Sequence, residues 1–365
     1  MEVPYSYLKE QFASPDAILA DVKKLVQSGD FTIGKALEEF EKRFASYLGA
    51  KYAIGVGTGT DALRFSLMAA GIKPGDEVIT AVNTFYSTAA AIATVGAKPV
   101  FVDIDDSLLM NPDLIEKAIT KKTKAIIPVH LHGLLSEMKN ISSIAKKHGL
   151  VIIEDSCQSL GATIEGKKAG TFGLTGCFSL HPLKPLNVWG DAGVVVTDSD
   201  TVKERILLLR NNGLKNRDEC EEYAYNCRMD TLQAVVGNHL IPDLDKVLEA
   251  KIANAKFYDK ELAKIKQIKV PARDKSARYV FHNYVVMAEK RDALIAHLQK
   301  NGVSAKIHYP IPLHLQKASK YLGHKAGDFP VAEAQAKKII SLPVHQYITK
   351  EQREFVVKMI KEFYK

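Results

Sequence analysis

The sequence predicts an α/β fold whose central sheet is mostly parallel. Short apolar runs bounded by glycine or proline, such as residues 150–153, 177–180 and 194–196, have the length and composition of buried strands. Segments with apolar residues at helical spacing lie between such runs along most of the chain. This repeated alternation of strand and helix favours parallel strands joined by right-handed crossovers.

The elements of the first 240 residues follow from spacing and from helix-start signals. After an irregular arm at residues 3–7, Ser14 is expected to cap a helix with Pro15 at its first position. Apolar residues at helical spacing predict a second helix up to Leu48. Further strands are expected at 52–56, 77–80, 98–103 and 125–129, and further helices at 87–95, 111–119, 141–148 and 202–210.

A second structural unit is predicted near the C-terminus. A long helix over 244–265 follows Pro242, and later strands are expected at 279–287 and 304–307. Two more helices should begin near Arg291 and Pro330. We therefore expect a large domain over residues 1–245 and a smaller C-terminal α/β domain over residues 246–365.

Polar side chains lie where the predicted strands end, which is where α/β proteins place their chemistry. Asp155 ends one apolar run, and Ser179 lies in the next run, which leads to Lys184. Pro182 and Pro185 flank this lysine and exclude it from a regular helix or central strand. A lysine held among the mostly uncharged residues around it has a lowered pKa and is a candidate Schiff-base amine. The alternative is an ordinary solvated lysine.

A glycine-rich turn offers a second candidate site. The segment Gly57-Thr58-Gly59-Thr60 links a predicted strand to a helix. The free N–H groups and positive dipole end of such a helix attract a phosphate. A lone Gly-x-Gly also occurs in many tight turns, so this signal gains its strength from its combination with Lys184.

These motifs, in this order, resemble those of the DegT/DnrJ/EryC1/StrS family of sugar aminotransferases. The resemblance runs from Val3 to Pro343 and includes Asp155 to Gln158, Ser179 to Lys184 and Trp189 to Gly193. Pro185 and Ala192 depart from the family's usual residues without removing a catalytic group. The resemblance implies the aspartate-aminotransferase fold, that is fold type I, and the cofactor pyridoxal 5′-phosphate (PLP).

The resemblance also implies roles for individual residues. Lys184 corresponds to the lysine that binds the cofactor covalently, and Asp155 to the carboxylate on its pyridine nitrogen. The other cofactor contacts are Gln158 at the phenolic oxygen, Phe85 on the ring, and Gly59, Thr60 and Ser179 at the phosphate. Asn226 would reach the phosphate bound in the neighbouring subunit of a homodimer with shared sites, and His308, Tyr309 and His314 would lie close to the substrate. The alternatives are a core role for Phe85 and a plain turn at Asn226.

The implied reaction moves an amino group, with glutamate as the expected donor, to a nucleotide-linked keto-deoxysugar. Such sugars serve cell-surface polysaccharides, lipopolysaccharide among them, or natural products. One rival is a PLP-dependent deoxysugar dehydratase, which carries histidine where this chain has Lys184. The other is a non-catalytic regulatory protein of the same fold, against which the intact set of Asp155, Ser179 and Lys184 argues.

Composition limits the other function classes. The net charge of +8 is spread along the chain without an arginine-rich block, so we expect no nucleic-acid partner, while an anionic substrate fits. The four cysteines show no metal-binding spacing and predict reduced thiols in the cytoplasm. We expect no signal peptide and no membrane span. We interpret His130 and His132 as loop histidines near the substrate, and expect no metal.

Overall fold

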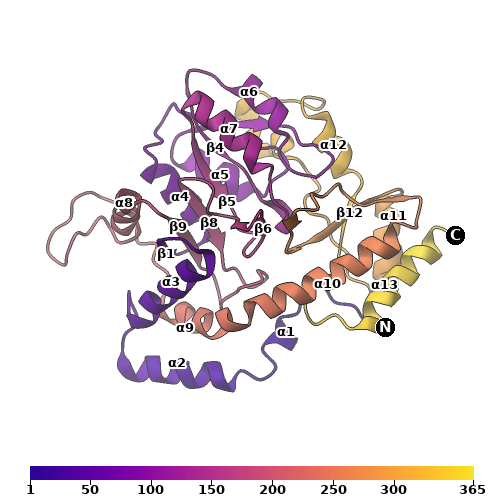
Figure 1. Cartoon of the computed structure of the whole chain (residues 1–365), viewed down its shortest axis with the longest axis horizontal. Helices are drawn as coiled ribbons and strands as arrows, with labels where there is room; N and C mark the ends of the chain where they lie inside the picture. The colour runs from indigo at the N-terminus through magenta and orange to yellow at the C-terminus, as the bar shows by residue number, and fades with distance from the viewer.

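A seven-stranded sheet forms the centre of the molecule in the computed structural model, which describes residues 1–365 (Figure 1). The strand order is β1-β9-β8-β5-β4-β2-β3. Only β9 runs antiparallel to its neighbours, so the predicted, mostly parallel sheet is confirmed. The strands are β1 (Tyr52–Val56), β2 (Glu77–Ala81), β3 (Lys98–Val102), β4 (Thr123–Ile127), β5 (Val151–Asp155), β8 (Thr175–Ser179) and β9 (Gly193–Thr197).

The helices of this part of the chain lie before, between and after these strands. They are α2 (Asp16–Ser28), α3 (Lys35–Leu48), α4 (Gly59–Ala69), α5 (Tyr86–Thr94), α6 (Ile115–Ala118), α7 (Met138–His148), α8 (Asp200–Arg210) and α9 (Thr231–Leu240). The expected cap of α2 is wrong by one residue. Because the carbonyl of Pro15 accepts the first helical hydrogen bond, from Leu19, the N-cap is Pro15 and not Ser14.

The C-terminal part begins with a long helix and has its own small antiparallel sheet. This helix, α10 (Leu244–Leu262), crosses the lower half of the view in Figure 1. The sheet has the order β10-β12-β13, with β10 (Ile268–Lys269), β12 (Tyr284–Ala288) and β13 (Ile339–Leu342). The helices α11 (Arg291–Lys300), α12 (Pro330–Ala336) and α13 (Lys350–Phe363) accompany it.

Two predicted strands are shorter than expected. The strand expected over 279–287 begins only at Tyr284, because Phe281 has a positive φ of 49° that extended backbone does not allow. The strand expected over 304–307 is reduced to a single bridge between Lys306 and Ser341. The residues directly before Tyr284 therefore form a loop and not a strand.

The two parts of the chain share contacts across the predicted domain boundary. One apolar cluster extends from Val3 to Ile360, and a third sheet joins β11 (Ala277–Arg278) to β6 (Thr163–Ile164) and β7 (Lys167–Lys168). The boundary expected after residue 245 coincides with the start of α10 and stays a prediction.

The N-terminal arm is ordered by long-range contacts and includes the short helix α1 (Leu8–Gln11). Val3 pairs with Val303, and the Tyr7 hydroxyl donates to the Lys184 carbonyl at 2.9 Å. The arm therefore ties the C-terminal part to the loop that carries Lys184.

The sheet brings its predicted polar residues to one edge. β5 ends at Asp155 and β8 at Ser179, and the two strands are parallel neighbours. β1 runs in the same direction as β8, because β9 is antiparallel to both. The turn between β1 and α4 therefore lies at this edge as well.

Candidate active site

A cavity of about 510 Å³ lies at this edge of the sheet. Its wall holds nine of the predicted site residues, namely Gly59, Thr60, Phe85, Asp155, Gln158, Ser179, Lys184, His308 and Tyr309. The predicted residues Asn226, His314, His130 and His132 do not line it. A larger depression of about 940 Å³ lies between α2, α3 and α9, but none of the predicted site residues line it. The first cavity is therefore the candidate active site.

Lys184 reaches this cavity from a loop fixed by hydrogen bonds. Its backbone N–H donates to the His181 carbonyl at 2.8 Å, and its carbonyl accepts from Tyr7. Asn187 donates to the Pro182 carbonyl at 2.6 Å in the same loop. Burial lowers the pKa of Lys184, while Cys157 and Asp155 oppose this shift. A larger fraction of the amine is thereby neutral and nucleophilic than for a solvated lysine.

Asp155 faces the cavity from the end of β5 with both oxygens engaged. The Thr88 hydroxyl of α5 donates to Oδ2 at 2.7 Å, and the backbone N–H of Cys157 donates to Oδ1 at 3.2 Å. Thr84 lies 3.0 Å from the Thr88 hydroxyl and extends this contact. The carboxylate is therefore held in one orientation and is buried, with 6 % of its surface exposed.

The N-terminus of α4 forms the anion-binding end of the cavity. Thr58 caps the helix through its side chain, which accepts from the Asp61 backbone N–H. A Cβ on Gly59 would lie 2.8 Å from the Ser179 Cβ and 3.0 Å from the Cys157 sulfur. Glycine therefore lets the helix start approach Ser179 closely, and the helix N–H groups and the Ser179 hydroxyl share one corner.

Gln158 and Tyr309 form a polar pair between the two parts of the chain. The Gln158 oxygen accepts from the His132 backbone N–H at 2.8 Å, which turns its NH₂ group toward the Tyr309 hydroxyl at 3.1 Å. The Tyr309 ring lies 5.4 Å from the Phe85 ring, centroid to centroid. Phe85 and Tyr309 thus form an aromatic part of the wall of the cavity that Asp155 also lines.

The remaining predicted residues are placed as follows. His308 lines the cavity and makes a 2.8 Å hydrogen bond to Ser341, and burial lowers its pKa to about 4. His314 is buried elsewhere, where it pairs with Glu333 at 2.9 Å and packs against Phe329. Asn226 is exposed and does not line the cavity of its own chain.

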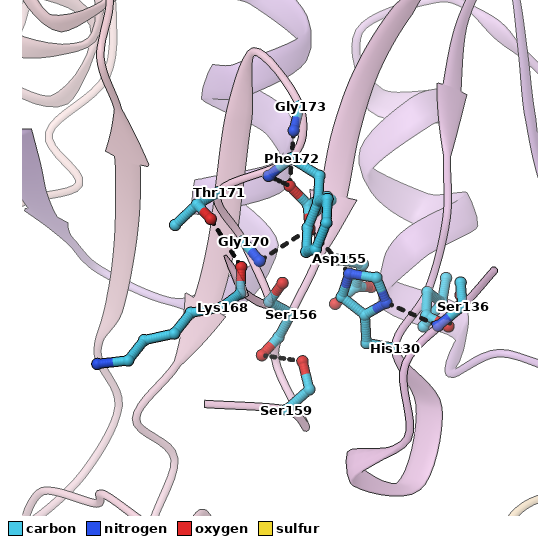
Figure 2. Close-up of polar contacts among 12 residues, drawn as sticks. His130, Ser136, Asp155, Ser156, Ser159, Lys168, Gly170, Thr171, Phe172 and Gly173 are labelled. Atoms are coloured by element: carbon cyan, nitrogen blue, oxygen red, sulfur yellow. Dashed lines mark hydrogen bonds and ion pairs between the residues drawn. The ribbon is translucent and has the colours of Figure 1, made fainter. Parts of the chain in front are cut away.

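The two loop histidines do not face the cavity, contrary to expectation. His130 is fully buried, and its Nε2 lies 2.9 Å from the Glu154 carboxylate (Figure 2). The Ser136 backbone N–H donates to His130 Nδ1, so Nε2 carries the proton and donates to Glu154. Backbone N–H groups of Gly170, Phe172 and Gly173 also donate to Glu154. His130 is thus a structural residue, and burial lowers the pKa of His132 to about 3.

Sequence reasoning missed several cavity residues. Thr88 and His282 come from segments that are distant in sequence from Lys184, and Asp191 lies within the Trp189–Gly193 motif without having received a role. The signal for Thr88 was the hydroxyl-rich start of α5, which follows a strand end. His282 had no such signal, since it depends on the turn that precedes β12.

Comparisons with known proteins agree with this geometry. Residues 14–361 match the model of the DegT/DnrJ/EryC1/StrS aminotransferase family. The chain is 41 % identical to a pleiotropic regulatory protein of Geobacillus stearothermophilus, over 100 % of this chain and 99 % of the relative. It is 38 % identical to a UDP-N-acetyl-3-dehydro-alpha-D-glucosamine 3-aminotransferase of Acidithiobacillus ferrooxidans, over 96 % and 95 % of the two chains.

Solved structures show the same fold. DesV of S. venezuelae in complex with a ketimine intermediate superposes with a TM-score of 0.97 at 35 % identity, covering 100 % of this chain and 99 % of DesV. The PLP form of the putative sugar aminotransferase Spr1654 from Streptococcus pneumoniae gives a TM-score of 0.90 at 27 % identity, with 95 % of each chain covered. The predicted fold type is confirmed, and the chain belongs to the DegT/DnrJ/EryC1/StrS aminotransferase family.

Proposed function

We propose that this enzyme transfers an amino group from an amino acid, with glutamate as the expected donor, to a nucleotide-linked keto-deoxysugar. The observation that carries the proposal is one cavity that holds the Lys184 amine, the Asp155 carboxylate and the N-terminus of α4. Members of the family are PLP-dependent sugar aminotransferases, and the relative from Acidithiobacillus ferrooxidans carries a UDP-sugar in its name.

The residues of the cavity fit PLP. The N–H groups of Gly59 and Thr60 and the Ser179 hydroxyl would hold its phosphate, and glycine at position 59 lets the helix start and Ser179 lie close enough to contact the same group. Asp155 would hold the ring nitrogen, Phe85 and Gln158 would contact the ring and its phenolic oxygen, and Lys184 would bind the aldehyde. When bound, PLP supplies an aldehyde that condenses with amines and a ring that withdraws electrons.

The protein contributes proton transfer and orientation. A neutral Lys184 amine, favoured by the burial that lowers its pKa, takes up the proton that leaves the donor's α-carbon. Thr88 and the Cys157 backbone fix Asp155, so its charge is already oriented when the ring binds. His308 and Tyr309 line the same cavity and are proposed to contact the sugar.

The setting of the reaction is part of the same proposal. All four cysteines are free, which supports a reducing cytoplasm. No helix in the structure has the length and apolar content needed to cross a membrane. The product would enter cell-surface polysaccharide, such as lipopolysaccharide, or a natural product. A homodimer with shared sites is proposed because Asn226 is exposed and away from its own cavity.

A spectroscopic test separates this proposal from its rivals. Glutamate should change the absorption of the PLP-loaded protein and release 2-oxoglutarate, and a nucleotide keto-sugar should restore the original spectrum. Lys184→Ala should abolish both changes, while the exposed Lys167→Ala should leave them intact. A wild-type protein that binds PLP but gives no 2-oxoglutarate with glutamate would favour the regulatory alternative, which the name of the Geobacillus relative keeps open.

A further inference from the structure

A second, smaller cavity of about 60 Å³ adjoins the candidate active site. The two cavities share three wall residues, Leu183, His282 and His308. The remaining walls come from the N-terminal arm, from α10 and from the segments around β12 and β13, namely Tyr5, Tyr7, Lys251, Asn283, Val344 and His345. A water molecule occupies about 30 Å³ in the liquid, so the space suits one carboxylate group.

Lys251 is the charged residue of this small cavity. It lies on the buried face of α10 with 3 % of its surface exposed, beside apolar neighbours such as Leu248 and Ile252. The protein supplies no carboxylate to its ammonium, and burial alone lowers its pKa, to about 7. A buried ammonium without a counter-ion is unfavourable, and a bound anion would relieve this cost.

The other polar groups of the cavity leave room for such an anion. Nδ1 of both His282 and His345 is buried without a hydrogen-bond partner, but only His282 can offer a proton there, because Nε2 of His345 donates to the Pro4 carbonyl at 3.0 Å. The titratable neighbours of Lys251 in this cavity are uncharged near neutral pH. Burial raises the pKa of Tyr5 and Tyr7. Burial also lowers the pKa of the three histidines, His282, His308 and His345. The cavity therefore has one potential positive charge and no negative charge.

We infer that this cavity is a carboxylate subsite, in which Lys251 binds the carboxylate of a substrate whose reacting group lies at Lys184. The inference rests on the proposed function, and it adds that one of the two substrates brings a second, anionic group. The shared walls at His282 and His308 place this subsite directly beside the reacting end of the larger cavity. An amino-acid donor and a uronic-acid sugar both carry a carboxylate, so the chemistry has two sources.

Calorimetric binding to the PLP-loaded enzyme tests the subsite without turnover. The probes are glutarate, which resembles a dicarboxylic donor without its amine, and glucuronate, which resembles an acidic sugar; glutaramide is the uncharged control. Lys251→Met should weaken binding of one carboxylate probe about tenfold or more, which corresponds to loss of one charge-assisted contact. Lys251→Arg should retain binding of that probe. Lys256 is exposed on the same helix, so Lys256→Met should bind both probes like wild type.

Proton uptake gives a second reading. Because the pKa of Lys251 in the ligand-free enzyme is about 7, binding of an anion at pH 8 should draw a proton from the buffer, and Lys251→Met should lose this uptake.

Loss of glutarate binding in Lys251→Met assigns the subsite to the donor, and loss of glucuronate binding assigns it to the sugar. The inference is overturned when both probes bind equally with and without Lys251, or when neither binds wild type. Amino transfer from glutamate is measured separately, so failure of the proposed function would be visible on its own.

Discussion

Asp155 acquires its orientation from segments far away in sequence. One of its oxygens depends on the Thr88 hydroxyl, which comes from α5 and lies 67 positions earlier in the chain. The motif around Asp155 thus identifies the carboxylate but not the residue that holds it in place. Thr88 is a positioning residue, since it acts on the cofactor site through Asp155.

Thr88→Val should slow amino transfer with little change in folding. Valine keeps the shape of threonine but removes the hydrogen bond to Asp155, and a bond to a charged group contributes about 1.5–3 kcal/mol. We expect a rate of glutamate-driven amino transfer lower by roughly tenfold or more, read from single-turnover absorbance. Thr94→Val, at the exposed end of the same helix, is the control. An unchanged rate in Thr88→Val would remove threonine from the mechanism.

Lys251→Met should stabilise the protein at neutral pH. The folded-state pKa of Lys251 is about 7 and the unfolded value is about 10.5, so the unfolded chain binds more protons between these values. Stability of the wild type therefore rises with pH across this window as far as Lys251 is concerned. The gain in melting temperature on Lys251→Met should be largest near pH 7 and shrink toward pH 10. A gain that does not depend on pH would argue against the lowered pKa of Lys251.

At the scale of elements, β5 is anchored through the residue before Asp155. Glu154 accepts hydrogen bonds from His130 and from three backbone N–H groups of the segment 170–173 (Figure 2). This carboxylate thereby joins β5, the loop after β4 and the segment before β8 into one unit. The position of Asp155 at the cavity depends on that unit.

Glu154→Gln should destabilise the fold, since an amide cannot accept all four bonds and its NH₂ group would face buried donors. Each buried donor left unpaired costs about 1–3 kcal/mol, so we expect a loss of several kcal/mol in the free energy of unfolding. Denaturant unfolding with two probes gives this value. Glu116→Gln removes an exposed carboxylate paired with Lys147 and should leave the midpoint nearly unchanged. Equal midpoints for the two variants would show that the Glu154 network is dispensable.

The elements that the sequence predicted well are those that periodicity alone specifies. The strand at Tyr52–Val56 and the starts of α11 and α12 agree with expectation. The failures depend on tertiary contacts: the bend at Phe281 shortens β12, and His130 is buried by its pairing with Glu154. Lys251 was missed although it occupies an apolar position of α10, because only the fold shows that no carboxylate reaches it.

At the scale of the whole molecule, one predicted cofactor contact, Asn226, does not line the cavity of its own chain. Asn226 lies in the segment between α8 and α9, pairs through its backbone with Asn211, and is exposed. Its neighbour Tyr223 is fully exposed as well. An exposed aromatic residue beside a predicted phosphate contact fits a surface that meets a second copy of the chain.

A mixing experiment tests shared active sites. Asn226→Ala should weaken PLP binding roughly tenfold, because a hydrogen bond to a charged phosphate is lost, and Lys184→Ala should be inactive. In a mixed dimer one site carries both changes and the other carries neither. An equal mixture should then recover about a quarter of wild-type activity at limiting PLP, more than either parent alone. Asn216→Ala, exposed in the same segment, should bind PLP like wild type. Activity of a monomer in light scattering, or a mixture no better than its parents, would place Asn226 outside the site.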